Sequence, residues 1–179
     1  MKLTGMMAIA VIFLVTTGCA TAPATVQGKA DIRAEADAAL SKARFTDPTI
    51  VGILSRSAGY AVFPSIGKGG LGVGGAYGKG VLYSNGRAVG YCDLTQTSIG
   101  AQVGGQSYSE IICFETWDSV ETFKQGNYRF NAQATAVALK SGAGENAKFR
   151  DGVAVFTMDE TGLMLEASVG GQKFSYQEI

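Results

Sequence analysis

The first folded segment of the chain has a helical pattern of apolar positions. Residues Lys29 to Phe45 contain neither glycine nor proline and are rich in alanine, glutamate, lysine and arginine, which are good helix formers. Their apolar side chains fall on one stripe, formed by Ile32, Ala36, Ala39, Leu40 and Ala43. The pattern therefore predicts an amphipathic helix at the start of the folded domain.

Two shorter helices are predicted from residues typical of helix ends. Thr46-Asp47-Pro48 offers a cap followed by proline at the first helical position, and the apolar residues after it predict a helix ending near 57–59. Another helix is expected over Trp117–Lys124, because Thr116 can cap its start and Gly126 can end it.

From Tyr60 onwards the pattern is that of β-strands. The first strand is short, Tyr60 to Phe63, and Pro64 is expected to end it. Residues 71–83 then place mostly bulky side chains at odd positions and glycine or alanine at most even ones. The bare face of such a strand allows another backbone or helix to approach closely. Ser84-Asn85-Gly86 predicts a hairpin turn.

The rest of the chain predicts further strands and completes the fold class. They are expected near 88–94, 98–104, 108–114, 130–139, 153–158, 162–169 and 173–177, with a loop at 141–146. A hairpin around Asp159-Glu160-Thr161 would pair the strands at 153–158 and 162–169, and the last strand would lie at an edge. The expectation is an α+β fold: a curved antiparallel sheet or partial barrel with two N-terminal helices and one mid-chain helix.

The N-terminus resembles a lipoprotein export signal. Lys2 is followed by an apolar run from Met6 to Val15, which is too short to span a bilayer, and then by Thr16-Thr17-Gly18-Cys19. We expect residues 1–18 to be removed, Cys19 to be lipidated and residues 19–28 to form a tether before a domain over 29–179. Ala20, in place of aspartate, favours an outer-membrane address facing the periplasm.

Composition argues against several functional classes. The chain has 15 basic and 15 acidic residues, and loss of Lys2 with the signal leaves a small negative charge, which disfavours general nucleic-acid binding. It has no histidine, the commonest general base and metal ligand, so we expect no enzyme, no metal and no cofactor. Cys92 and Cys113 lack a histidine partner; either they form a disulfide or they are two small core residues.

Three basic residues near the glycine-rich strand are candidates for binding lipid headgroups. Lys68 and Lys79 lie at either end of the strand, and Arg87 follows its hairpin turn. Backbone amides of a glycine-rich loop together with lysine can hold a phosphate, although charges at turns are also often merely solvated. The match of Gly67–Gly72 to a dinucleotide-binding motif is discounted, because a strand rather than a helix follows it.

The long glycine pattern resembles a known family. Gly59–Ser84, Asp93–Phe114 and Gly162–Tyr176 are similar to the SYLF domain, also called the lipid-binding or Las17-binding actin-regulator domain. The similarity extends over Lys29 to Ile179, and the bacterial branch of the family is similar to this chain in carrying a lipoprotein signal. It implies phospholipid binding without catalytic residues, whereas actin is not an expected partner in a bacterial envelope.

Two functions remain open at this stage. The first is an envelope lipoprotein whose domain binds membrane phospholipids, assisted by its amphipathic N-terminal helix. The second is a structural lipoprotein whose glycine-lined face docks an envelope protein. Binding of the soluble domain to anionic vesicles would distinguish them.

Overall fold

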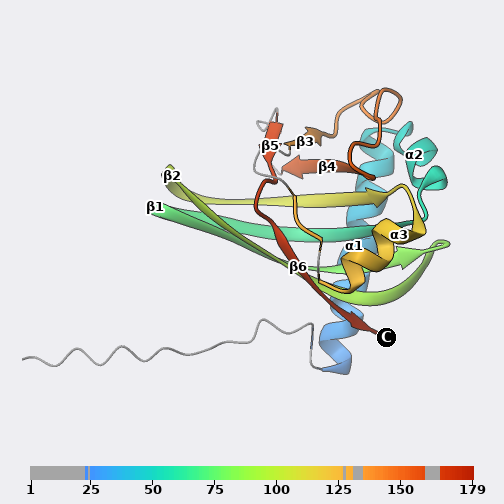
Figure 1. Ribbon diagram of the computed structural model, residues 1–179, viewed down its shortest axis with the longest axis horizontal. Coiled ribbons are helices and arrows are strands. Elements are labelled where there is room, and N and C mark those ends of the chain that lie inside the picture. The colour runs from blue at the N-terminus through green and yellow to red at the C-terminus, as the bar shows by residue number, and fades with distance from the viewer. Residues whose placement is uncertain (1–22, 24, 127, 131–134, 160–165) are drawn as a thin grey trace, which may run out of the picture.

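The computed structural model describes residues 23, 25–126, 128–130, 135–159 and 166–179, and in them three helices accompany a curved sheet (Figure 1). The predicted α+β fold class is confirmed. The elements in chain order are α1 (Val26–Thr46), α2 (Ile50–Arg56), β1 (Gly59–Ser84), β2 (Arg87–Phe114), α3 (Trp117–Lys124), β3 (Thr135–Ala138), β4 (Val153–Asp159), β5 (Glu166–Ser168) and β6 (Lys173–Glu178).

Helix α1 covers one face of the sheet. Its buried stripe contains Ile32, Ala36, Leu40 and Ala43, four of the five residues that the apolar pattern predicts. Two polar contacts add to this packing, because Tyr83 donates a hydrogen bond to Asp37 (2.7 Å) and Arg33 donates one to the Tyr91 hydroxyl (3.0 Å). The helix begins at Val26, within the segment predicted to be a tether, and Thr25 caps it by accepting a hydrogen bond from the Gly28 N–H (3.0 Å).

One long hairpin, β1 with β2, forms the centre of the sheet. The predicted turn is present, and Asn85 and Gly86 both adopt positive φ (51° and 71°), as a tight hairpin turn requires. The several short strands predicted on either side of it are wrong. Each side is a single strand, and Pro64 lies at a register irregularity between Phe63 and Ile66 that bends β1 without ending it.

The hairpin turns back on itself at the end opposite its turn (Figure 1). There the register passes from Leu71↔Val103 to Val73↔Ile99, so β2 has extra residues at the bend. As a result the two halves of β1 approach each other across the bare face of the strand. A Cβ on Gly80 would lie 2.6 Å from the Val62 carbonyl oxygen, and one on Gly78 would lie 2.6 Å from the Ile66 side chain. The predicted close approach of another backbone is therefore an approach of β1 to itself.

The C-terminal strands are arranged differently from the predicted hairpin. The sheet order is β1-β2-β4-β3-β5, so β3 lies between β4 and β5, parallel to the first and antiparallel to the second. Residues 160–165, which include part of the predicted turn, lie outside the described residues. β6 pairs only with β2 among the described strands, as expected of an edge strand.

The two shorter helices agree with prediction to different degrees. α3 has the predicted bounds, with Thr116 accepting from the Ser119 N–H (3.2 Å) and Gly126 at φ 70° after its end. α2 begins at Ile50 instead of at the proline. Pro48 lies in the turn before the helix, where Asp47 ends α1 and its side chain accepts a hydrogen bond from the Thr49 backbone N–H.

The concave side of the sheet encloses a second core that is rich in aromatic rings. Phe174 lies at the centre, with ring centroids 5.0 Å from Phe123, 5.7 Å from Phe130 and 5.9 Å from Phe63. Both remaining cysteines are buried and free, Cys92 in this core and Cys113 in the one under α1. They lie in the same strand and are not bonded to each other, so the disulfide alternative is wrong. The prediction that they are small core residues is confirmed.

Candidate membrane-binding corner

The junction between α1 and α2 is held to a distant loop by one buried carboxylate. Asp47 accepts hydrogen bonds from the backbone N–H of Thr49 (3.1 Å) and from its hydroxyl (2.6 Å). It also accepts from the backbone N–H groups of Gly142 (3.1 Å) and Gly144 (2.6 Å), almost a hundred residues later. Burial raises the pKa of Asp47, but these four donors outweigh it, and the pKa is lowered overall.

The loop fits closely against the start of α2. A Cβ on Gly144 would lie only 2.5 Å from the Ile50 backbone nitrogen, so no larger residue fits there without movement. Ala143, Ala147 and Phe149 pack against the core under α1. The end of α1, helix α2 and residues 139–149 therefore form one contiguous part of the surface.

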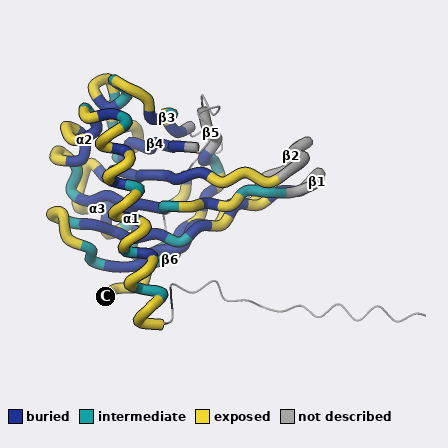
Figure 2. The backbone as a smooth tube through the Cα atoms, turned by 180° about the vertical axis from the view of Figure 1, so that it is seen from behind, coloured by how far each residue is buried: buried dark blue, intermediate teal, exposed yellow. Residues whose placement is uncertain are grey.

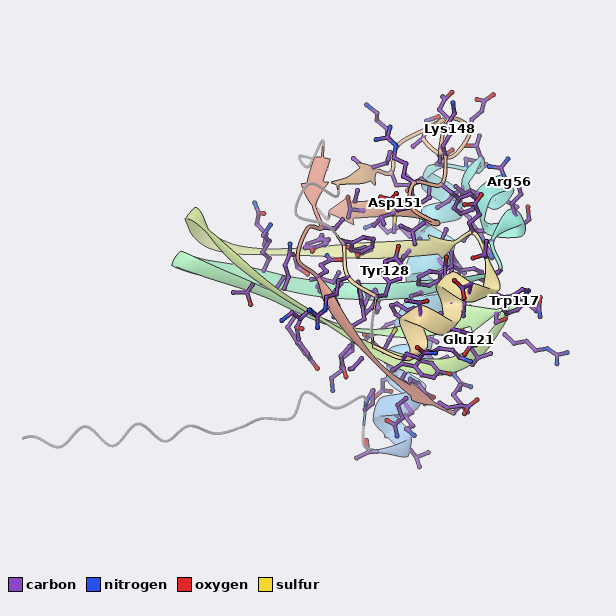
Figure 3. All side chains as sticks on the ribbon, in the orientation of Figure 1. Arg56, Trp117, Glu121, Tyr128, Lys148 and Asp151 are labelled. Atoms are coloured by element: carbon purple, nitrogen blue, oxygen red, sulfur yellow. The ribbon has the colours of Figure 1, made fainter. Side chains whose placement is uncertain are left out.

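Exposed apolar and basic side chains gather on this part of the surface. Phe45 in the last turn of α1 is 89% exposed and Val51 on α2 is 49% exposed. Four basic residues are exposed around them, and Figure 3 shows Arg56 and Lys148 at the same end of the molecule. We call this surface the basic corner and define it by Arg44, Phe45, Val51, Arg56, Lys140 and Lys148.

The charge of the basic corner differs in sign from that of the chain as a whole. Residues 42–56 and 139–149 contain five basic and two acidic residues, and one of the acidic residues is the buried Asp47. The exposed acid is Glu145. A local excess of Lys and Arg beside exposed apolar side chains is typical of surfaces that bind anionic membranes.

The three basic residues predicted from the sequence do not form one site. Lys68 and Lys79 lie on the two halves of β1, and Lys79 pairs across the hairpin with Asp93, whose carboxylate accepts from Tyr77 and Ser175. Arg87 pairs with Ser84, which lies five residues beyond Lys79 along β1. The backbone positions of Lys79 and Ser84 are therefore about 17 Å apart. The structure thus brings none of these residues into the basic corner.

A shallow hollow of about 390 Å³ lies next to the basic corner, between α1 and the strands β1, β2 and β4. Glu35 and Lys42 line it from the helix, and Lys42 is one turn before Phe45. Ser65 and Ser107 line it from the strands and are hydrogen-bonded to each other (3.0 Å). The hollow extends the polar surface of the corner along α1.

The described residues contain no cluster of metal ligands, and their two thiols are protonated at neutral pH. In them no three His, Cys, Asp or Glu side chains come together as metal ligands. Burial raises the pKa of the Cys113 thiol to about 12 and that of Cys92 well above its usual range, so neither is a reactive thiolate at neutral pH. Of the helices in the described ranges, none is long and apolar enough to cross a bilayer.

Comparison with known proteins identifies the family. Residues 95–178, from the first half of β2 to the end of β6, match the Ysc84 family, described as Las17-binding protein actin regulator. The chain carries a Ysc84, or SYLF, domain. It is also similar to Beta cell expansion factor A from Aeromonas veronii, with 30% identity over 146 residues. That alignment covers 80% of this chain and 55% of the relative, so the chain spans about half of the relative's length.

The SYLF resemblance predicted from the glycine pattern is thereby confirmed, and the structure shows what the glycines do. Gly78 and Gly80 allow β1 to fold back on itself, which curves the sheet. The basic corner, in contrast, was missed. Its residues come from two segments that are far apart in the sequence, and the bonds from Gly142 and Gly144 to Asp47 that join them have no local signal.

Proposed function

We propose that this chain is an envelope lipoprotein, anchored through Cys19, whose SYLF domain binds anionic phospholipid membranes without catalysis. Cys19 and the export signal lie outside the described residues, so the anchor is proposed from the sequence alone. The outer membrane is the proposed location, with the domain on its periplasmic side. The observation that carries the binding proposal is the basic corner.

Phe45 is the strongest single indication. A phenylalanine that is 89% exposed beside Arg44 loses no interaction with the protein when it enters a lipid interface. Burying such a side chain contributes about 2 kcal/mol. Each basic residue close to an anionic surface contributes about 1 kcal/mol more, and the contribution falls as salt screens it. A few such residues give useful affinity once an acyl anchor confines the domain.

The length of the tether is compatible with this contact. Val26 lies seven positions after Cys19, so the chain between them can span at most about 25 Å. Phe45 lies 19 residues beyond Val26, or about 28 Å along α1. The basic corner therefore meets the bilayer that holds the anchor when α1 lies along the membrane instead of standing upright on it.

Vesicle sedimentation tests the proposal. A chain beginning at Ala20 keeps every described helix and strand but cannot be acylated. We expect this shortened chain to sediment with vesicles containing phosphatidylglycerol at low salt and to remain in solution at high salt. It should not sediment with vesicles of phosphatidylcholine alone. R44Q/R56Q should weaken binding by about 30-fold, which corresponds to about 2 kcal/mol.

The hairpin lysines supply a matched control. K68Q/K79Q removes the same number of positive charges from a surface outside the basic corner. Its binding should stay within about twofold of wild type, since only charges near the bilayer contribute. Equal loss in the two double variants would show that net charge alone drives binding, and absence of binding at low salt would refute the function.

The alternative function, docking of an envelope protein on the glycine-lined face, loses its surface in this fold. Gly74, Gly78 and Gly80 are buried, and the first half of β1 lies against the last two. Figure 2 shows buried and exposed residues alternating along this part of the hairpin, so that one face is buried and the other is not. A partner would have to use another face, and no observation favours one.

A further inference from the structure

One carboxyl group is buried in the concave core without a charged partner. Glu110 is 0% exposed and points to the same side of β2 as Ile112 and Phe114, into the aromatic core. Its Oε2 accepts one hydrogen bond, from the Gln172 amide (3.0 Å). Within the described part of the chain, its Oε1 has no hydrogen-bond partner. An ionised carboxylate in such a place costs several kcal/mol.

The polar atoms around Glu110 supply oxygen rather than positive charge. Thr157 faces Glu110 across the β2–β4 pair and is 2% exposed, and its hydroxyl has no hydrogen-bond partner among the described residues. Gln172 is 0% exposed, and in the same part of the structure its Oε1 has no partner either. Neither side chain carries a positive charge that could balance an ionised Glu110. A protonated carboxyl group needs no such charge and adds a donor to this set of polar atoms.

Glu110 also holds a loop to the sheet. Gln172 belongs to the segment Val169–Gln172 between β5 and β6, and Gln96, from the other half of β2, donates to the Gly170 carbonyl of the same segment (2.9 Å). β6 follows at once, and its Phe174 fills the aromatic core. The protonation state of Glu110 therefore affects how firmly residues 169–178 are held to the sheet.

We infer that Glu110 is held as the neutral carboxylic acid at neutral pH, and that its ionisation in alkaline solution weakens the attachment of the 169–172 loop and of β6. The contact between Glu110 and Gln172 is thus a proton-dependent element within the fold. It is independent of the basic corner and of membrane binding, so the two proposals stand or fall separately.

The neighbouring groups agree with a proton rather than an ion pair. β1 presents Phe63 at the position paired with Glu110, β4 presents Thr157, and β2 itself presents Tyr108, whose pKa is raised by burial and by Glu110. Lys173, next to Gln172, is exposed, and Asp159 ends β4 opposite Tyr108 in the register. Burial raises the pKa of Glu110 to about 8, although the bond from Gln172 lowers it.

Two measurements on the wild-type chain test this directly. Infrared spectroscopy of the chain beginning at Ala20 should show a protonated carboxyl band at pH 6 that disappears with a midpoint near pH 8. Hydrogen exchange, corrected for the intrinsic rate, should show the opening of residues 169–178 rising roughly 50-fold between pH 6 and pH 8, since linkage gives nearly tenfold per unit over this range. The chain has no histidine to obscure the transition.

The matched variants are E110Q and E35Q. Glutamine keeps the shape and has no proton to lose, so E110Q should lack both the band and the pH-dependent opening. E35Q changes an exposed residue and should behave as wild type. A missing band in the wild type would overturn the inference, as would opening that responds to added Na⁺ or Ca²⁺ but not to pH, since a cation would then take the place of the proton.

Discussion

Asp47 and Glu110 are both completely buried acids, but their surroundings give them opposite properties. Asp47 lies where two chain segments end and point four donors at it, and its pKa is lowered. Glu110 lies on a strand whose own N–H groups are used in the sheet, and a single side chain donates to it. The comparison teaches that the charge of a buried acid depends on the donors around it as well as on the loss of hydration, which is greater for Glu110 in the core than for Asp47 near the surface.

The two regions also differ in what they do for the molecule. Asp47 uses its charge to join the halves of the basic corner, which faces solvent. Glu110 lies in the aromatic core, where a charge would weaken the attachment of β6. Removal of Asp47 should therefore destabilise the basic corner, whereas removal of Glu110 should stabilise the attachment of β6 at alkaline pH.

The largest effect is expected for D47A. It leaves the N–H groups of Gly142 and Gly144 without an acceptor and should lower the free energy of unfolding by about 4 kcal/mol in urea denaturation at pH 7. D31A, at an exposed position of α1, is the control and should cost less than about 0.5 kcal/mol. A D47A variant as stable as wild type would mean that the bonds to the loop contribute nothing.

The pH dependence of stability sharpens the contrast. Because the folded-state pKa of Glu110 lies above its unfolded value of about 4.3, the folded state binds the extra proton, and the wild type should lose roughly 3 kcal/mol between pH 5 and pH 8. E110Q should show no such loss. Asp47 affects stability at acid pH. Its contribution to the free energy of unfolding is complete above about pH 4, and it is lost as the pH falls through the lowered pKa of Asp47.

A steric test addresses the same corner without touching a charge. G144A places a Cβ 2.5 Å from the Ile50 nitrogen and should cost about 2 kcal/mol by thermal or urea unfolding. G52A is the matched control, because a Cβ there meets nothing within 4 Å and alanine favours the helix. It should leave stability unchanged or raise it by up to about 1 kcal/mol. If both variants behaved alike, the close fit of the loop would be disproved.

The smallest effect is expected for Q172M, which removes the one donor to Glu110 at similar volume. Stability at pH 5 should fall by about 1 kcal/mol. Because the bond from Gln172 lowers the pKa of Glu110, its loss should move the midpoint of the alkaline transition upwards. A downward movement would contradict the assigned role of this bond.

Local patterns in the sequence were sufficient for the helices and the hairpin turn. The apolar stripe of α1, the cap at Thr116 and Asn85-Gly86 act within a few residues, and each lies where predicted. Pro64 was misleading as a strand end, and the predicted breaks between the later strands of the hairpin were wrong as well. The hairpin tolerates Pro64 by bending, and only its pairing over the full length of β1 and β2 reveals that.

Long-range contacts account for what the sequence could not predict. The insertion of β3 between β4 and β5 leaves no trace in any single strand. The basic corner depends on Asp47 reaching the loop at 142–144. Glu110 did carry a signal, since it is an acid in the middle of the strand predicted at 108–114, but its meaning required Thr157 and Gln172 to be placed beside it.

Fluorescence from a probe at a chosen position tests the central claim, contact of the basic corner with the bilayer, most directly. The chain beginning at Ala20 lacks Cys19, and its native thiols Cys92 and Cys113 are buried. A polarity-sensitive dye can therefore be attached selectively to V51C in the basic corner or to R87C at the hairpin turn. With vesicles containing phosphatidylglycerol, we predict a blue shift and an intensity gain at position 51 and no change at position 87. A response at position 87 with none at position 51 would contradict the account and favour the hairpin surface.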